Sequence, residues 1–335
     1  MIRLCMAFLL WASLASAQNT LRVASYNVGL GRDGPGLLLK DILQEKPDIL
    51  AIARIISTVN PDILLLTGFD NDFENVAIER FAALTGLEYR YIYAPLGNGG
   101  RDSGLDINGN GRLRDWNDNW GFGRFEGSEG MALLSRYPVT NSRRFDQLKW
   151  QDFGPPPLKA NGELFFAHWP ALRLAAHSLW DVEITLPNGA LSILAAHPTP
   201  PVFDGEEDAN GLRNAAEISF LERYLGGEAM RDDAGLVAPL ADTPVILLAD
   251  LNADPARGES RKPGLRALLA HPRLQPMPAY DTVDWERAGR MQVDYVLPDA
   301  RLKVLESGVY WPENETLLDR AKTRHRLIWA DIALP

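Results

Sequence analysis

Cysteine is almost absent from this 335-residue chain, and its single cysteine, Cys5, lies in an apolar N-terminal segment. Arg3 precedes an apolar stretch from Leu4 to Leu14, and Ala15-Ser16-Ala17 follows it, which is the pattern of a secretory signal peptide. We expect cleavage after Ala17 and export to the periplasm or the extracellular space. The remaining chain then has no cysteine, which excludes disulfides, thiolate metal sites and cysteine nucleophiles from it.

Long hydrophobic runs are lacking as well. The leader is too short to span a bilayer, and no later segment reaches the roughly 18 apolar residues of a transmembrane helix. Hydrophobic residues make up 46% and charged residues 23% of the chain, as is typical of a soluble globular protein. Because no internal repeat or linker-like segment is found, we expect residues 18–335 to form a single domain, and a monomer without a membrane span.

Basic residues are outnumbered by acidic ones, 34 to 44, and the net charge is −10. Removing Arg3 with the leader makes the chain more acidic still. Proteins that bind nucleic acid usually present a basic face, whereas the basic runs here are as short as Arg143-Arg144 and Arg261-Lys262. Tight non-specific binding to nucleic acid is therefore disfavoured, although a local basic cleft stays compatible with the composition.

The hydrophobic pattern alternates strands with helices in the first part of the chain and adds hairpins later. Asn188-Gly189 separates two segments of period-two alternation, which indicates a β-hairpin. Mixed connections of this kind predict one α/β domain, a sandwich of mixed sheets, in preference to a doubly wound parallel sheet. The expected strands are 21–27, 63–67, 131–135, 181–186, 191–196, 245–250, 292–297, 303–310 and 327–332, and the expected helices are 47–59, 73–85, 214–224 and 265–269.

A long segment from Gly97 to Gly130 is rich in glycine, asparagine and aspartate, so we expect it to be either functional or disordered. Within it, Asp106, Asn108 and Asn110 stand at positions one, three and five of a pattern with glycine at position six, as in the first half of a calcium loop. The closing glutamate is absent, although nearby aspartates could complete the shell. The alternative is a polar turn held by its own side chains. We favour a structural calcium ion, because an exported protein meets high calcium concentrations.

The apolar strand from Val245 ends abruptly in two polar residues, Asp250 and Asn252. Side chains alternate along a strand, so both emerge on the same side of its C-terminal end. Two oxygen-bearing side chains on a rigid element suit a hard cation or a phosphate ester. The alternative is a strand followed by an Asx turn, which uses the same residues.

Other strands also carry a polar residue where they begin or end. One such residue alone could cap a strand or be a satisfied core histidine, but several together favour a shared pocket. The set is Asn27, His197, Asp250, Asn252, Asp294 and His325.

These motifs together resemble the endonuclease/exonuclease/phosphatase superfamily, which has the deoxyribonuclease-like fold. The resemblance runs from about Leu21 to Leu334, and its most specific element is the run from Asp250 to Pro255, with Ala249 in place of the usual glycine. It implies a four-layer α/β sandwich, two packed mixed β-sheets flanked by helices, and divalent-metal-dependent cleavage of phosphate esters. The matching segments are Ser25-Tyr26-Asn27, Gly130-Met131-Ala132-Leu133-Leu134-Ser135-Arg136, Ala196-His197-Pro198, Ala249-Asp250-Leu251-Asn252, Val293-Asp294-Tyr295 and His325.

The resemblance also implies a role for each matching residue. Asp294 would orient His325, which would take a proton from the attacking water or, if protonated, hold the phosphate. Asp250 would align or deprotonate that water. Asn252 and His197 would donate hydrogen bonds to the phosphoryl oxygens. A magnesium or manganese ion would supply Lewis acidity.

Two positions depart from the family pattern and remove negative charge from the expected metal site. Gly68 stands where the family has a metal-binding glutamate, and Arg324 stands where it has an aspartate. Three interpretations follow: Asp70 or Asp72 replaces the missing ligand, Arg324 clamps a phosphate directly, or the protein binds without turnover. We favour the first, and the expected ligands of the catalytic ion are then Asn27, Asp70 and Asp250.

The sequence therefore predicts an exported, metal-dependent phosphodiesterase or phosphomonoesterase that hydrolyses a soluble phosphate ester. One alternative is a catalytically degraded member that acts as a binding protein. Another is a secreted nuclease, which the acidic charge disfavours. The expected substrate-binding residues are Asn27, Arg324, Arg213 and Asn214.

Overall fold

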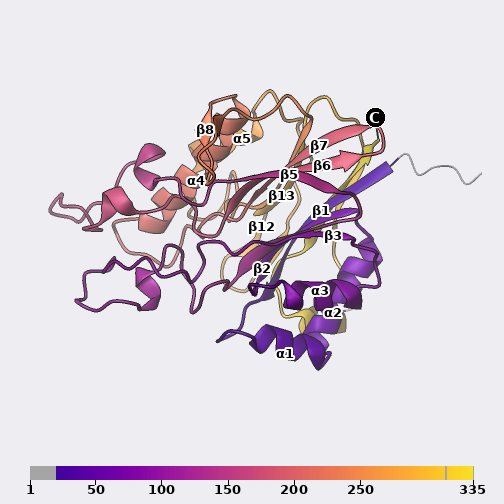
Figure 1. The fold of residues 1–335 in the computed structure, drawn as a ribbon, viewed down its shortest axis with the longest axis horizontal. Helices are drawn as coiled ribbons and strands as arrows, with labels where there is room; N and C mark the ends of the chain where they lie inside the picture. Colours follow the sequence, from indigo (N-terminus) through magenta and orange to yellow (C-terminus); the bar gives the residue numbers. More distant parts are fainter. Residues whose placement is uncertain (1–19, 314, 335) are drawn as a thin grey trace, which may run out of the picture.

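Two β-sheets packed face to face form the centre of the computed structural model, which describes residues 20–313 and 315–334 (Figure 1). The signal peptide predicted for residues 1–17 lies outside the described residues. The first sheet contains, in spatial order, β14 (Val304–Tyr310), β15 (Leu327–Ala333), β1 (Thr20–Leu30), β2 (Ile63–Phe69), β4 (Gly130–Ser135) and β3 (Tyr91–Tyr93). The second contains β13 (Asp294–Pro298), β10 (Val245–Asp250), β7 (Gly189–Ala196), β6 (Leu179–Leu186) and β5 (Val139–Arg144). Two-stranded sheets are formed by β11 (Val283–Trp285) with β12 (Gly289–Met291) and by β8 (Met230–Arg231) with β9 (Val237–Ala238).

Helices cover the outer face of each sheet, as Figure 1 shows. The first sheet packs against α1 (Leu37–Leu43), α2 (Pro47–Val59), α3 (Val76–Leu84) and α6 (Glu315–Ala321). The second packs against α4 (Ala209–Leu225) and α5 (Lys262–Leu269). Short 3-10 turns lie in the long loops, at η1 (Trp116–Asp118), η2 (Trp150–Asp152) and η3 (Trp169–Ala171). The order helix, sheet, sheet, helix confirms the four-layer α/β sandwich.

Alternation along the strands divides their side chains between different hydrophobic layers. In β2, Ile63 and Leu65 enter the core between the sheets, whereas Leu64 and Leu66 face the helices. In β10, Ile246 likewise faces the first sheet. Both faces of these central strands are buried, and for that reason their sequences are apolar throughout.

The elements that the pattern does not predict are short or exposed. β5 is an edge strand with largely exposed side chains, so it shows no apolar alternation. α1 and α6 span seven residues each, which is too short for a helical period to stand out. α4 begins at Ala209 rather than at Asn214, because Asn210 and Gly211 are weak helix formers that hide its first turn.

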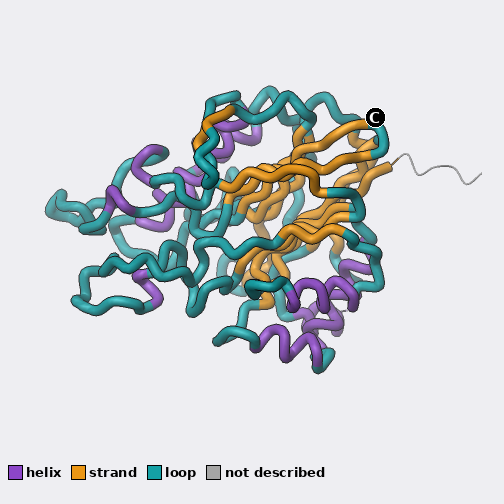
Figure 2. Tube along the Cα trace, in the orientation of Figure 1, coloured by secondary structure: helices purple, strands orange, loops and turns teal. Residues whose placement is uncertain are grey.

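The glycine-rich segment from residue 97 to 130 is folded tightly onto the body. Buried Asn98 donates from Nδ2 to two backbone carbonyl groups at 2.8 and 2.9 Å, and its Oδ1 accepts from Arg173 at 2.7 Å. A Cβ at Gly121 would overlap the carbonyl oxygen of Ala176, so this approach requires glycine. Polar and backbone contacts therefore hold the segment, and Figure 2 shows long loops gathered at one end of the sheets.

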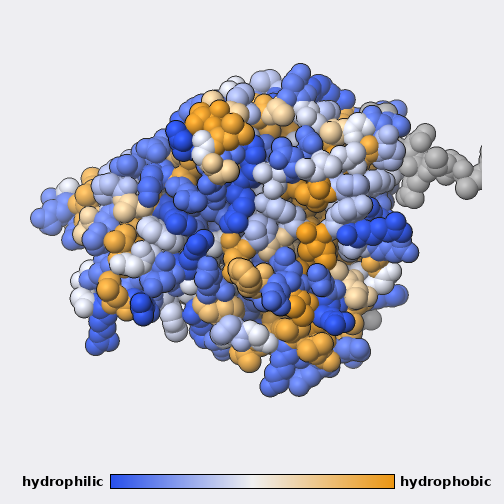
Figure 3. All heavy atoms as spheres, viewed as in Figure 1, coloured by the Kyte–Doolittle hydropathy of each residue, from blue (hydrophilic) through white to orange (hydrophobic). Residues whose placement is uncertain are grey.

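The helices are short compared with the thickness of a bilayer. Within residues 20–313 and 315–334, none is long and apolar enough to cross a membrane. The face drawn in Figure 3 is mainly hydrophilic, with hydrophobic residues in small separate groups. The apolar side chains are instead concentrated in the layers between the elements.

Replacing Asn98 by leucine should lower the free energy of unfolding by about 2–4 kcal/mol, because two buried carbonyl groups and Arg173 lose their partner. Urea denaturation followed by circular dichroism measures this change. Asn161→Leu, in an exposed turn, is the matched control and should cost less than about 0.5 kcal/mol. Equal costs for the two substitutions would contradict the supporting role of Asn98.

Candidate active site

Four strands deliver polar side chains to one end of the core between the two sheets. In β10 and β7 every second residue faces this core, and the two series end at Asp250 and at His197. β13 runs antiparallel to β10 and begins at Asp294, which pairs with Asp250 in register. β1 contributes Asn27 from the first sheet. Period-two alternation thus turns all four side chains inward, at the point where the two sheets meet.

The carboxylate of Asp250 is the centre of this cluster and is fully buried. Its Oδ2 accepts a hydrogen bond from Asn27 Nδ2 at 2.8 Å and lies 3.5 Å from His197 Nε2 and 3.8 Å from His325 Nδ1. Its Oδ1 accepts from the backbone N–H of Asn252 at 3.0 Å. Burial opposes ionisation, but the two histidines and Asn27 outweigh it and hold the pKa of Asp250 well below its ordinary value. Asp250 is therefore ionised at neutral pH.

His325 is held by a carboxylate of its own, since its Nδ1 lies 2.9 Å from Asp294 Oδ2. Burial raises the pKa of Asp294 to about 6. Burial opposes protonation of His325, but the carboxylates of Asp294 and Asp250 outweigh it and raise the pKa of His325 to about 9. At neutral pH the two side chains therefore form a buried ion pair.

Asn252 and His197 lie on neighbouring loops that follow β10 and β7. The side-chain Nδ2 of Asn252 donates to the carbonyl oxygen of Pro198 at 3.0 Å. Its amide thus fastens the loop after His197, while its backbone N–H supports Asp250. The expected hydrogen bonds from Asn252 and His197 to a phosphoryl oxygen stay a prediction.

Two threonines that the sequence pattern does not single out hold the backbone around these residues. Thr282 Oγ1 accepts from the N–H of Asp294 at 3.0 Å. Thr323 Oγ1 accepts from the N–H of His325 at 3.2 Å and donates to the carbonyl oxygen of Asn27 at 2.9 Å. Thr323 could have been found, because a hydroxyl two residues before a site residue often bonds its backbone N–H. Thr282 has no such local signal.

Asp250, Asp294 and His325 could hold a metal ion, since each offers one ligand atom and these atoms lie within 4.8 Å of one another. A magnesium ion commonly takes one or two carboxylates from a protein, and substrate oxygens complete its shell. The residues present therefore fit a divalent cation without fixing which one. Asn27 adjoins the group through its hydrogen bond to Asp250.

Gly68, where the resemblance implied a glutamate, lies directly beside Asn27. Its φ of 66° is left-handed, and a Cβ there would overlap Asn27 Oδ1. The expected substitute Asp70 accepts two backbone hydrogen bonds, at 2.7 and 2.9 Å, and burial raises its pKa to about 6. Asp72 accepts from N–H groups in the first turn of α3. Both aspartates are thus held by backbone groups, and neither joins the three clustered ligand atoms.

Arg324 does not follow its neighbour His325 into the cluster. Its guanidinium forms an ion pair with Glu286, in the turn between β11 and β12, and 54% of its side chain is exposed. The structure therefore does not place Arg324 in the cluster around Asp250, and its expected contact with a phosphate stays a prediction.

The polar face of α4 supports the site from behind. Arg213 donates to carbonyl groups of the segment before β6, with 3.0 Å to Leu174 O. Fully buried Asn214 donates from Nδ2 to Thr199 O at 2.8 Å and to Leu251 O at 2.9 Å. In the structure both side chains donate to the backbone of segments that carry site residues, and the expected binding of substrate by Arg213 and Asn214 stays a prediction.

The predicted calcium loop folds as a polar turn. The carboxylate of Asp106 accepts from the N–H groups of Asn110, at 3.0 Å, and of Gly111, at 2.9 Å. The amides of Asn108 and Asn110 donate to the carboxylate of Asp115 and lower its pKa. These bonds are the ones expected of the alternative interpretation, and calcium at this loop stays a prediction.

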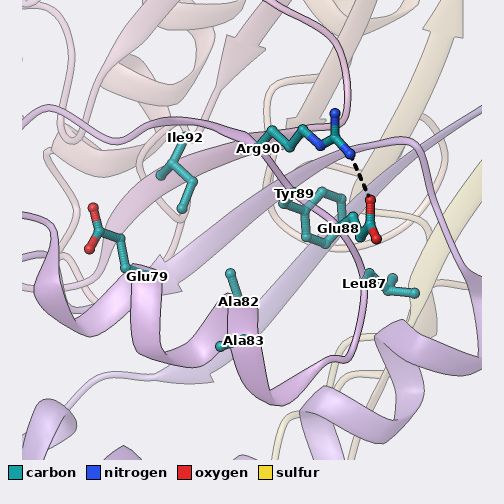
Figure 4. A pocket seen from close by; sticks show the side chains of 8 residues that line it. All are labelled: Glu79, Ala82, Ala83, Leu87, Glu88, Tyr89, Arg90 and Ile92. Atoms are coloured by element: carbon teal, nitrogen blue, oxygen red, sulfur yellow. Dashed lines mark hydrogen bonds and ion pairs between the residues drawn. The ribbon is translucent and has the colours of Figure 1, made fainter.

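A cavity of about 690 Å³ lies elsewhere, between α3 and the segment that enters β3 (Figure 4). Figure 4 shows the side chain of Arg90 turned toward Glu88 across its rim. No residue of the cluster around Asp250 lines this cavity. Its lining residues are Glu79, Ala82, Ala83, Leu87, Glu88, Tyr89, Arg90 and Ile92.

One further residue at the site, His177, has no counterpart in the sequence prediction. Its ring stacks on the ring of His197, with centroids 4.1 Å apart. The predicted hairpin held part of the signal, because Leu179 pairs with Ala196 in register, and continuing that register places residue 178 opposite residue 197 and residue 177 one position further along. The register counted from Asn188-Gly189 brings the segment of His177 near His197, but it does not predict that the two rings stack.

Comparisons with known proteins identify the fold. The sequence profile of the Endonuclease/Exonuclease/phosphatase family matches residues 24–321. No curated protein matches the chain. A solved endonuclease/exonuclease/phosphatase from Beutenbergia cavernae DSM 12333 is similar, with a TM-score of 0.54 and 17% identity over 94% of this chain and 72% of that chain.

Two further solved structures are similar over almost their whole length. For an endonuclease/exonuclease/phosphatase family protein from Leptotrichia buccalis C-1013-b, the TM-score is 0.52 and the identity 16%, over 93% of this chain and 99% of that chain. For sphingomyelinase C from Streptomyces griseocarneus, the TM-score is 0.50 and the identity 16%, with the same coverage of 93% and 99%. At these identities the likeness shows a shared fold alone.

Replacing Gly68 by alanine should lower the free energy of unfolding by about 2–3 kcal/mol, because a left-handed φ disfavours a Cβ and the methyl group would displace Asn27. Gly86 has a similar φ of 69° with open space around it. Gly86→Ala is therefore the matched control and should cost about 1 kcal/mol, by backbone strain alone. Urea denaturation measures both, and equal costs would show that the overlap with Asn27 has no effect.

The His325–Asp294 pair should make stability fall in alkaline solution. The pKa of His325 is raised from 6.5 to about 9, so its stabilising contribution is complete below pH 6.5 and is lost as the pH rises through 9. In EDTA-treated protein we expect a loss of about 1–3 kcal/mol in the free energy of unfolding between pH 7 and about pH 10. His325→Gln should flatten this part of the profile. A slope unchanged by the substitution would mean that another group titrates.

Proposed function

Because the chain belongs to the endonuclease/exonuclease/phosphatase family, we propose that it is a metal-dependent phosphoesterase that hydrolyses a soluble phosphate ester. The observation that carries the proposal is the convergence of Asn27, His197, Asp250 and His325 from separate strands and loops on one buried point. The imidazolium of His325 and the imidazole nitrogen of His197, beside an ionised carboxylate, suit a phosphoryl group and an attacking water. We include in the proposal the export expected from residues 1–17.

The charge states assign different tasks to the two kinds of residue. Asp250 stays ionised, so its carboxylate is the group that accepts a hydrogen bond from the attacking water. His325 keeps its proton at neutral pH, so its imidazolium holds an anionic phosphoryl oxygen, and taking a proton from water is the less favoured role. His197 Nε2, 3.5 Å from Asp250 Oδ2, faces the same point from the second sheet.

A divalent cation would be held by Asp250 and Asp294, beside Asn27, and when bound it supplies Lewis acidity to the phosphoryl group. Its affinity should be modest, because Gly68 contributes no carboxylate and Asp70 is held by backbone groups. Magnesium and manganese both suit oxygen ligands of this kind.

The substrate is proposed to be a soluble ester rather than a polynucleotide. The net charge of −10 works against a long polyanion, and Arg324 is engaged by Glu286. A phosphodiester and a phosphomonoester are both compatible with the cluster.

A binding protein without turnover is the second candidate, and a specific observation favours it. Gly68, with its left-handed backbone, offers no carboxylate that could bind a metal ion. Asn27, which lies beside Gly68, donates a hydrogen bond from its Nδ2 to Asp250. Such a protein would bind phosphate through the imidazolium of His325. Hydrolysis decides between the two candidates.

The test is hydrolysis of bis-p-nitrophenyl phosphate and p-nitrophenyl phosphate after EDTA treatment and after addition of Mg²⁺, Mn²⁺ or Ca²⁺. We expect activity with Mg²⁺ or Mn²⁺, and losses of about 10²–10⁴-fold in kcat/KM for Asp250→Ala and His325→Ala. The side chain of Asp242 is 99% exposed. Asp242→Ala is therefore the matched control and should keep full activity.

The other outcomes each point to one alternative. No hydrolysis with any of the three metals would reject the enzyme and favour the binding protein. Degradation of plasmid DNA at low salt would favour the nuclease.

A further inference from the structure

His197 rests against a second histidine that the proposed chemistry does not use. The rings of His177 and His197 are nearly parallel, with an angle of 14° and a centroid distance of 4.1 Å. His177 Nδ1 also lies 2.9 Å from the backbone carbonyl oxygen of His197. His177 comes from the segment just before β6 and is buried. It therefore contacts both the side chain and the backbone of His197.

The partner of His177 determines its tautomer. A carbonyl oxygen only accepts, so Nδ1 of His177 must carry the hydrogen. Burial, followed by the nearby His197, lowers the pKa of His177 to about 3. The ring is therefore neutral at physiological pH, and it presents a flat, uncharged face to His197.

His197 and His325 are oriented in different ways. A histidine at a catalytic site is usually oriented by a hydrogen bond to its second ring nitrogen, and Asp294 provides that bond for His325. The second nitrogen of His197, Nδ1, is buried and has no hydrogen-bond partner among the described residues. What orients the ring of His197 is thus its stacking on His177 together with its contact to Asp250.

His177 is itself held rigidly on both sides. The backbone N–H of Asn98 donates to the carbonyl oxygen of His177 at 2.8 Å. The buried carboxylate of Glu217, on α4, accepts from the N–H of Ala176 at 2.8 Å and from the N–H of Thr199 at 2.7 Å. One carboxylate thus clamps the residue before His177 and the loop after His197, so the two rings cannot separate easily.

From this geometry we propose that His177 is a positioning residue, which holds the ring of His197 toward Asp250 by stacking and by a hydrogen bond to the His197 carbonyl. The proposal rests on the proposed phosphoesterase function. His177 does not touch the reacting atoms, and its effect passes through His197.

Three substitutions separate the two contacts. His177→Phe keeps a stacked ring and loses the hydrogen bond, His177→Asn keeps a donor and loses the ring, and His177→Ala loses both. We expect His177→Ala to lower kcat by about 10- to 100-fold, as misplacement of a catalytic group does, with KM within about twofold of wild type. His177→Phe should retain more activity than His177→Ala. A KM effect with unchanged kcat would overturn the proposal.

A double substitution tests whether the effect passes through His197. In a His197→Ala background, His177→Ala should cause no further loss of kcat, because the ring that it positions is gone. Independent losses that multiply would overturn the proposal and assign His177 a general structural role. His168→Ala, which removes a histidine outside the cluster, serves as the control and should leave kcat unchanged.

A spectroscopic measurement keeps the proposal testable even if no activity is found. In ¹H–¹³C spectra of histidine-labelled protein, the ring protons of His197 should be shifted upfield by the stacked ring. His177→Ala should remove that shift, while His177→Phe should preserve most of it and the His325 signals should stay in place. If the wild-type protein hydrolyses no phosphate ester, the proposed function is rejected, but the stacking of His177 on His197 is not. A His197 signal unmoved in both folded variants would overturn the stack itself.

Discussion

Burial of the Asp250 carboxylate is the constraint around which the rest of the site is arranged. An ionised carboxylate withdrawn from water is costly unless it is hydrogen-bonded and paired with positive charge. Here the first sheet supplies the amide of Asn27, the loop after β10 supplies the N–H of Asn252, and two histidines stand within 3.8 Å. Compensation therefore comes from both sheets at once, so the cluster exists only when they are packed in this register.

A second layer of polar contacts holds the loops that carry these groups. α4 turns Asn214 and Glu217 inward, and both side chains end on backbone atoms of the loops after β7 and β10 or of the segment before β6. Buried backbone groups need partners, and loops at a site have no sheet neighbours to provide them. The polar face of α4 is thus needed because the site is built on loops, whose backbone groups it hydrogen-bonds. Asn98, in the glycine-rich segment, likewise donates to backbone carbonyl groups, those of Asp146 and Ala175.

Gly68, where the resemblance implied a carboxylate, is closely packed against Asn27 and leaves no room for a side chain. Gly68 is the extra residue of a bulge in the pairing of β2 with β4 and has a left-handed φ, and the amide of Asn27 lies where a side chain at 68 would begin. Asn27 itself matches the family pattern, and its neutral amide turns toward Asp250 and donates to it. The cluster thus contains two carboxylates, Asp250 and Asp294, and one imidazolium, that of His325.

Much of the fold was within reach of the sequence. Period-two and 3.6-residue patterns are local, and they located the central strands, the hairpin at Asn188-Gly189 and the long helices. They failed for β5, an exposed edge strand, and for α1 and α6, which are too short to show a period. The site was foreseen in the same way, because a polar residue at the end of an apolar strand is a local signal.

What the sequence by itself determined is which strand ends carry polar side chains and on which face, since alternation follows from the geometry of each strand alone. Only the tertiary structure decided which of these side chains meet, because that depends on how the two sheets pack. Packing brought Asn27 to Asp250 and His177 to His197. It also turned Arg213, Asn214 and Asp70 to backbone groups and left Arg324 at the surface, where water and Glu286 solvate its charge at lower cost than burial would.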